Sequence, residues 1–185
     1  MVLRFISRKE YRSLRDAGWR PEPEQLERWG VARPQLLAEG GAGPHALKGC
    51  GEIWEEISKQ LQPAHLLLAS GTGTTAAGIL SAMPEGSPTK VHVISAVKGA
   101  RREQAMVEAL AIHRRLQVHW EDESAFGGFG RVTAELLVLR ERFEAESGIS
   151  IDPCYNAKVW AYLQRTPLSG SVVWLHTGGV FQEST

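Results

Sequence analysis

The chain has 185 residues, which is enough for one substantial domain with a hydrophobic core. Its 21 Lys and Arg residues balance its 21 Asp and Glu residues, so the zero net charge argues against electrostatic capture of nucleic acid or of an anionic membrane. No apolar run approaches the ~20 residues of a membrane-spanning helix, and no signal peptide is visible. We therefore expect a cytoplasmic protein without a nucleic-acid partner or membrane contact.

Cysteine and histidine residues give no sign of a disulfide or of a metal site. Cys50 and Cys154 are the two cysteines, far apart in the sequence, and are most simply free thiols. The six histidines are scattered, and none forms the H-x-x-x-H pair that ligates metal from one helix face. The sequence predicts no metal ligand.

The first sixty residues predict short strands and helices, with a variable loop at residues 17–34. A short strand is expected at 2–6, followed by a helix that Ser7 and Glu10 open as a capping box. A helical turn is expected at 24–29 and a possible strand at 35–38. Apolar residues then recur every three or four positions, which predicts one face of a helix: Leu47, Cys50, Ile53, Trp54, Ile57 and Leu61.

After residue 65 the pattern alternates between strands and helices. Strands are predicted at 66–69, 90–97, 116–120 and 172–176, and helices from the turn after residue 73 to about 83, and at 101–115, 134–146 and 157–163. Such alternation is typical of an α/β fold, in three layers, with a mostly parallel sheet and helices on both faces.

A glycine-rich turn separates the first of these strands from its helix. Gly71 and Gly73 allow a sharp turn and a close approach of the backbone to a ligand. The first amides of the helix that follows have no intrahelical partner and carry partial positive charge. Four hydroxyl side chains surround the same point: Ser70, Thr72, Thr74 and Thr75. Together they predict a phosphate-binding turn.

The residues of the turn do not by themselves identify which phosphate-bearing ligand it binds. No lysine lies in the turn, so the mononucleotide P-loop is excluded. Gly71, Gly73 and Ala76 formally match the dinucleotide fingerprint, although no acidic residue follows the next strand. Three basic residues there keep an NADP-binding alternative open: Lys98, Arg101 and Arg102. A turn that binds no ligand is the remaining alternative.

Ligands of parallel α/β sheets bind outside the carboxyl ends of the strands. Four glycine-bearing loops follow such ends or lie near them: Glu39–Gly43, Ser70–Thr75, Phe126–Arg131 and Thr177–Gly179. Their convergence predicts a single site.

Four motifs in this order resemble one family. They are Glu39-Gly-Gly, Ser70-Gly-Thr-Gly-Thr-Thr, Ile151-Asp-Pro-Cys-Tyr-Asn-Ala-Lys and Leu175-His-Thr-Gly-Gly. The chain resembles the 1-aminocyclopropane-1-carboxylate deaminase / D-cysteine desulfhydrase family, which are pyridoxal-phosphate enzymes of the tryptophan-synthase-β type (fold type II). The resemblance runs over almost the whole chain, from near Met1 to Val180.

The resemblance implies a cofactor, a substrate class and roles for individual residues. The cofactor is pyridoxal 5'-phosphate, with its phosphate held by residues 70–75 and further contacts from Asn156, Thr177 and Gly178. Tyr155 is implied as the catalytic residue. Small amino acids are the implied substrates, and a homodimer or a companion N-terminal segment the implied partner.

The resemblance also implies that this chain is the C-terminal portion of such an enzyme. Family members carry a preceding segment with the Schiff-base lysine, and none of the six lysines here lies in a similar context. We therefore expect residues 1–185 to form the large phosphate-binding domain with a remnant of the smaller domain near 1–16, and to be inactive alone. An incomplete sheet would expose an apolar patch and favour poor solubility or oligomers.

Three departures from the family pattern bear on its chemistry. Phe129 stands where relatives carry a tyrosine, so a proton-transferring phenol is lost there. Ala42-Gly43 replace Ser-Asn, and Asn156 replaces the glutamate of the deaminases or the Thr or Ser of the desulfhydrases. A neutral amide favours the desulfhydrase side. A non-catalytic phosphate- or cofactor-binding module, or a subunit that requires a partner, is the alternative function.

Overall fold

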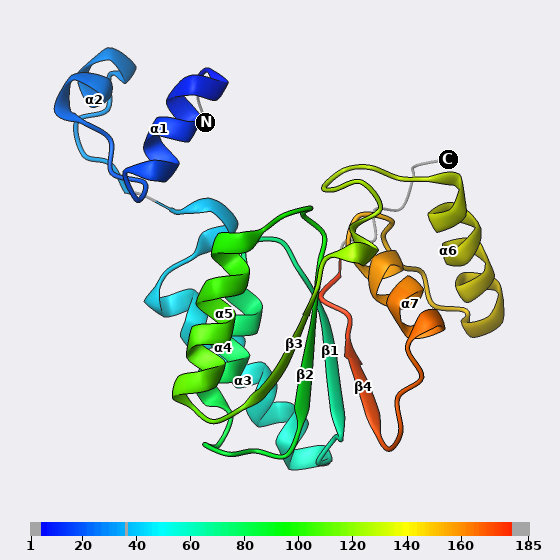
Figure 1. Ribbon diagram of the computed structural model, residues 1–185. Coiled ribbons are helices and arrows are strands. Elements are labelled where there is room, and N and C mark those ends of the chain that lie inside the picture. The colour runs from blue at the N-terminus through cyan, green and yellow to red at the C-terminus, as the bar shows by residue number, and fades with distance from the viewer. Residues whose placement is uncertain (1–4, 36, 179–185) are drawn as a thin grey trace. The chain divides into compact units, whose positions relative to one another are not determined.

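The computed structural model describes residues 5–35 and 37–178 of the chain. These residues fall into two compact units, Met1–Gly43 and Pro44–Thr185, which we describe separately (Figure 1).

The first unit contains α1 (Arg8–Asp16), α2 (Pro23–Trp29) and the short 3-10 helix η1 (Glu39–Gly41). The predicted capping box is confirmed, since the Ser7 hydroxyl accepts from the Glu10 amide and the Glu10 carboxylate accepts from the Ser7 amide at 2.9 Å. An ion pair of 2.7 Å between Arg28 and Glu10 joins the two α-helices.

Two predicted strands of this unit need comment. Residues 2–4 of the strand predicted at 2–6 lie outside the described residues, and Phe5 and Ile6 are not in a strand. The strand predicted at 35–38 is wrong for residues 35, 37 and 38, which are irregular. No strand lies in the described part of this unit, so an extended segment there finds no hydrogen-bonding neighbour. Leu37 is accordingly 86% exposed.

The second unit is built on a four-stranded parallel sheet. Its strands are β1 (His65–Ser70), β2 (Lys90–Ser95), β3 (Gln117–Glu121) and β4 (Val172–Leu175), in the order β3-β2-β1-β4. All neighbouring strands pair in parallel, so their carboxyl ends meet at one edge of the sheet. The predicted strands are thereby confirmed, with ends that differ by at most two residues.

Helices cover both faces of this sheet, which confirms the predicted three-layer α/β fold. The helices α3 (Pro44–Gln60), α4 (Thr74–Ala82) and α5 (Arg101–His113) lie on one face (Figure 1). On the other face lies α7 (Asn156–Arg165), with α6 (Ala134–Ser147) packed against it. Among the described residues, no helix has both the length and the apolar character needed to cross a membrane.

The core follows from the two-residue alternation of side chains along a strand. Leu66 and Leu68 of β1 face α3, α4 and α5, where they join Trp54, Ile79 and other buried residues. Leu67 points the opposite way and packs in a second cluster under α7. Because neighbouring side chains of β1 alternate between the two faces, the continuous apolar run of β1 is explained by burial on both sides.

The position of α4 depends on one glycine. A Cβ atom on Gly78 would lie 2.4 Å from Cys50 Cβ and 2.7 Å from the Leu47 carbonyl oxygen. The α3 and α4 backbones therefore approach more closely than any other residue would allow. This contact fixes the helix whose start forms the predicted phosphate turn.

Candidate phosphate-binding site

The predicted turn lies at the carboxyl edge of the sheet. The strand β1 ends at Ser70 and α4 begins at Thr74, so the chain reverses within three residues. Gly73 has φ +77°, and a Cβ there would also lie 3.0 Å from the Met106 methyl carbon. The left-handed backbone favours glycine at this position.

This turn leaves hydrogen-bonding groups without protein partners. Gly73 is the N-cap of α4 and has no side chain, so no side chain caps the first amides of the helix. The Ser70 hydroxyl is buried and has no hydrogen-bond partner among the described residues. Thr72 and Thr74 share a hydroxyl contact of 3.0 Å beside it. An unpaired buried hydroxyl next to an uncapped helix start fits an anion such as a phosphate group.

Tyr155 lies directly over this turn. A Cβ on Gly71 would be 3.3 Å from the Tyr155 hydroxyl, so glycine gives the phenol room to approach the backbone. The ring of Phe129 packs against the Tyr155 ring, with centroids 5.7 Å apart. The structure thus brings the proposed catalytic residue and the predicted phosphate turn together.

A carboxylate at the start of α7 holds Tyr155 in place. Asp152 Oδ1 accepts from the Tyr155 amide at 2.6 Å, and Asp152 Oδ2 accepts from the Asn156 amide at 3.0 Å. A negative charge at a helix start also interacts favourably with the helix dipole. The Asp in the D-P-x-Y motif is therefore a helix-capping residue, a role that we did not predict.

The side chain of Asn156 is buried in a set of hydrogen bonds with fixed polarity. Its Nδ2 donates to Asp152 Oδ2 at 2.7 Å and to the Gly178 carbonyl at 3.4 Å, while its Oδ1 accepts from Trp174 Nε1 at 3.2 Å. Since an indole nitrogen only donates and a carbonyl only accepts, the orientation of the amide is settled. Both amide protons are engaged, so Asn156 offers a ligand only the second lone pair of Oδ1.

The segment after β4 reaches the site through its backbone. The Gly178 carbonyl accepts from Asn156, and the Gly178 amide donates to His176 Nδ1 at 3.3 Å. His176 Nε2 then donates to the Ser150 carbonyl at 3.2 Å, as expected for a structural histidine. Thr177 is exposed, and Gly179 lies outside the described residues.

Lys158 is fully buried beneath the same site. Its ammonium group donates to the carbonyl oxygens of Ala96 at 3.1 Å and Gly128 at 3.0 Å. Burial lowers the pKa of Lys158, while Cys154 and Asp152 act in the opposite direction. No sequence signal other than its place in the Y-x-x-K motif pointed to these contacts.

Three of the four predicted loops therefore meet in the second unit. They are Ser70–Thr75, Phe126–Arg131 and the described part of Thr177–Gly179. The fourth, Glu39–Gly43, belongs to the first unit.

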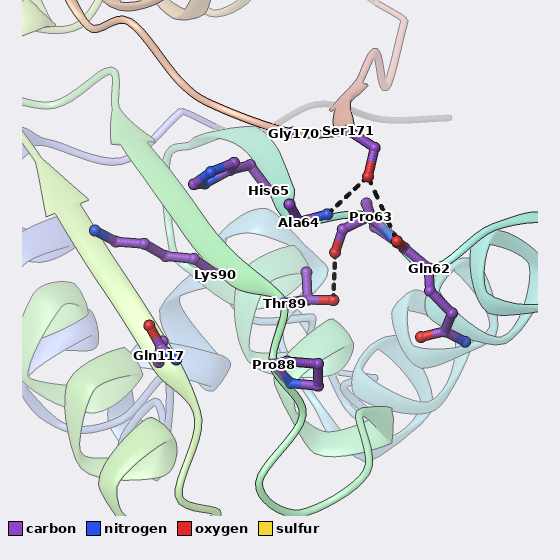
Figure 2. A pocket seen from close by; sticks show the side chains of 10 residues that line it. All are labelled: Gln62, Pro63, Ala64, His65, Pro88, Thr89, Lys90, Gln117, Gly170 and Ser171. Carbon is purple, nitrogen blue, oxygen red and sulfur yellow. Dashed lines mark hydrogen bonds between the residues drawn. The ribbon is translucent and has the colours of Figure 1, made fainter.

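Hollows among the described residues lie at two places along the sheet. One, of about 360 Å³, adjoins the glycine loop and is lined by Lys98, Asp122, Glu123, Ala125, Phe126 and Gly127. The other, of about 510 Å³, lies where β1, β2 and β3 begin, at the edge opposite the turn (Figure 2). Its hydroxyls are already paired, since Thr89 donates to the Pro63 carbonyl and Ser171 accepts from the Ala64 amide. The phosphate turn remains the better candidate site.

A hydrogen-bonded chain of aromatic side chains joins α7 to the sheet. Tyr162 Oη lies 2.8 Å from His92 Nδ1, His92 Nε2 lies 2.9 Å from His65 Nδ1, and His65 Nε2 lies 3.1 Å from the Ser169 carbonyl. Because the Ser169 carbonyl only accepts, the neutral His65 ring donates to it from Nε2. His65 Nδ1 then accepts from His92 Nε2, and His92 Nδ1 accepts from the Tyr162 hydroxyl. Burial, together with His65, Lys90 and His119, lowers the pKa of His92 from 6.5 to about 4.

Comparison with known proteins gives relatives with consistent names. The chain is 28% identical over 166 residues to a protein of Pyrococcus abyssi provisionally named 1-aminocyclopropane-1-carboxylate deaminase, covering 80% of this chain and 50% of that protein. It is 26% identical over 167 residues to the D-cysteine desulfhydrase of Serratia proteamaculans, covering 80% and 51%. No family model matches the chain.

A solved structure shows the same fold. The crystal structure of a homologue of 1-aminocyclopropane-1-carboxylate deaminase superposes with a TM-score of 0.67 at 22% identity, covering 85% of this chain and 52% of the other. The chain spans about half the length of the relatives it matches.

Fold and site together define a three-layer α/β protein with a phosphate-type turn at the carboxyl edge of its sheet. The resemblance to the 1-aminocyclopropane-1-carboxylate deaminase / D-cysteine desulfhydrase family is confirmed, and the chain fits the C-terminal portion of that family.

Proposed function

We propose that this chain forms the phosphate-binding part of a pyridoxal-phosphate-dependent deaminase or desulfhydrase that acts on small amino acids. The observation that carries the proposal is the Tyr155 hydroxyl over Gly71, at a turn with an uncapped helix start and an unpaired Ser70 hydroxyl. The names of the relatives support the substrate class.

The turn would hold the phosphate group of the cofactor. Its donors are the first amides of α4 and four hydroxyls, those of Ser70, Thr72, Thr74 and Thr75. Pyridoxal phosphate supplies an electron sink for carbanion chemistry when bound. Asn156, Thr177 and Gly178 would contribute the remaining contacts, and the polarity of the Asn156 amide restricts its contribution to accepting a hydrogen bond.

Tyr155 is the proposed proton-transferring group. Its phenol can hold or release a proton at Oη, and the Asp152 cap and the Phe129 ring fix its position. Phe129 itself can only shape the site and exclude water. This arrangement supports Tyr155 as an acid–base group next to the turn.

We further propose that the chain contributes no Schiff-base lysine and is inactive alone. Of the six lysines, Lys158 is committed to two carbonyl oxygens, and the others lie on exposed or half-buried surface. The engagement of Lys158 favours the alternative function, a cofactor-binding module or a subunit that requires a partner. Treatment with pyridoxal phosphate and borohydride should label no single lysine stoichiometrically, and stoichiometric labelling of one lysine by peptide mapping would contradict this part.

Thermal unfolding tests the phosphate turn. A ligand at 100 times its Kd stabilises a folded protein by about 2.7 kcal/mol, so inorganic phosphate and pyridoxine phosphate should each raise the Tm. Thr75→Val keeps the shape of the side chain but removes its hydroxyl, and should reduce this rise. Ser58→Ala on α3 is the control and should leave the rise unchanged. A rise with NADP but not with pyridoxine phosphate would instead support the dinucleotide alternative.

A further inference from the structure

The loop that carries Phe129 is held at its centre by a side chain from another element. Gly128 has φ +113°, is buried, and offers its carbonyl oxygen to the Lys158 ammonium at 3.0 Å. The amide of Gly128 donates to the Ala125 carbonyl at 2.9 Å, and the Gly128 carbonyl also accepts from the Arg131 amide at 3.3 Å. The next residue is Phe129.

The same ammonium group also reaches the edge of the sheet beside the phosphate turn. Lys158 donates to the Ala96 carbonyl, and the amide of Ala96 donates to the Ser70 carbonyl at 2.8 Å. Ser70 is the residue with which the turn begins. One side chain therefore connects the base of the turn to the loop that places the Phe129 ring.

Burial of the Lys158 ammonium costs free energy, so a specific role is needed to explain it. Desolvation penalises a buried ammonium strongly, and its two hydrogen-bond partners among the described residues are neutral carbonyl oxygens. A buried methionine of similar length would fill the same space without that cost. Conversely, only a donor at this point can hold two carbonyl oxygens from separate loops at a fixed separation.

We propose that Lys158 is a positioning residue that sets the place of Phe129 over the phosphate turn, and thereby gives the site its preference for aromatic over aliphatic phosphate monoesters. The preference for aromatic monoesters rests on the proposed function, namely that the turn binds phosphate. The positioning of the Phe129 loop by Lys158 does not depend on it. Phe129 is 59% exposed and packs against the Tyr155 ring, so it offers a free aromatic face beside the hydroxyl that overlies Gly71.

The experiment compares two ligands of the same charge by titration calorimetry. Pyridoxine phosphate carries the aromatic ring and no aldehyde, so it cannot react with surface lysines, and glycerol phosphate has no ring. The wild-type chain should prefer pyridoxine phosphate by about two- to tenfold, because one aromatic contact contributes about 0.5–1.5 kcal/mol. In Lys158→Met the ratio of the two affinities should fall toward one. The lost positive charge weakens the binding of both ligands equally, because they carry the same charge. Its effect therefore cancels in the ratio of the two affinities.

Two further variants separate positioning from charge and from folding. Lys158→Gln retains an NH2 group with two donors but no charge, and should restore part of the preference. Phe129→Leu leaves Lys158 intact and should bring the ratio of the two affinities toward one. A folded Lys158→Met chain with the wild-type ratio would overturn the proposal, as would a Phe129→Leu chain that keeps it.

Hydrogen exchange without ligand tests the positioning separately. The amides of Gly128 and Arg131 should exchange at least about tenfold faster in Lys158→Met than in wild type, while those of β1 keep their rates. Unchanged exchange in the loop would refute the positioning role. If the wild-type chain binds neither monoester, the proposed function fails, and the exchange rates still decide the role of Lys158 in the loop.

Discussion

At the scale of single residues, the site is defined by hydrogen-bonding groups whose partners are fixed or missing. Asp152, Asn156 and Lys158 each hold defined hydrogen-bond partners, so each has a structural contact to lose. Ser70 is the opposite case, because its buried hydroxyl has no partner among the described residues. This difference gives two predictions that can be measured on individual side chains.

Ser70→Ala should stabilise the chain and weaken phosphate binding at the same time. Removing an unpaired buried hydroxyl should raise the free energy of unfolding in phosphate-free buffer by about 1 kcal/mol, and should reduce the added stability that phosphate gives. Ser95 lies opposite Ser70 in the sheet and is the matched control, because its hydroxyl donates to the Val97 carbonyl at 2.8 Å. Ser95→Ala should lower the free energy of unfolding by about 1 kcal/mol. Equal effects of both substitutions in urea unfolding would refute this account of Ser70.

His92 should make the stability depend on pH. Its pKa is about 4 in the folded chain against 6.5 for the free side chain, so the unfolded state binds the proton first as the pH falls. The free energy of unfolding should therefore decrease between about pH 6.5 and pH 4, by about 1.4 kcal/mol per pH unit at most. His92→Gln removes this titration, and its unfolding free energy should fall less steeply over the same range. Parallel pH profiles of the two chains would contradict the assignment.

At the scale of elements, the contact between α3 and α4 places the start of α4 at the sheet edge. Gly78→Ala would force a Cβ to within 2.4 Å of Cys50 Cβ, so we expect a loss of about 2–3 kcal/mol of unfolding free energy or more. Gly49 lies in α3 with nothing within 4 Å of an added Cβ, so Gly49→Ala should stabilise the chain by about 0.5–1 kcal/mol. Denaturant unfolding measures both, and a Gly78→Ala chain as stable as wild type would show that the helices can move apart.

The elements also show what the sequence could and could not predict. Short apolar runs that alternate with helical patterns predicted β1 to β4, and the S-G-T-G-T-T pattern predicted the turn. Both patterns lie within a few consecutive residues, so the sequence shows them directly. The strand predicted at residues 35–38 failed because strand formation depends on a neighbour that the sequence does not show. The contacts of Lys158 and the chain from Tyr162 to Ser169 join residues up to 104 positions apart. They depend on strand register and loop placement, which no local pattern specifies.

At the scale of the whole molecule, the chain divides at Gly43 into two units. Residues 31–35 and 37 between α2 and η1 are irregular and exposed, as is typical of a site of proteolysis. Thermolysin, which cleaves before large apolar residues, should cut first near Leu37 and leave a resistant fragment that contains the sheet. Mass spectrometry identifies the fragment, and first cuts within residues 65–121 would contradict the division.

The central claim is that the turn at residues 70–75 binds the phosphate group of pyridoxal phosphate. The most direct test is an NMR titration of the isotope-labelled chain with pyridoxine phosphate and with inorganic phosphate. We predict saturable shifts of the backbone amides of Gly71–Thr75 with both ligands, and additional shifts near Tyr155 and Phe129 with pyridoxine phosphate alone. Shifts confined to the opposite edge of the sheet, around Lys90 and Gln117, or no saturable shift at all, would contradict the claim.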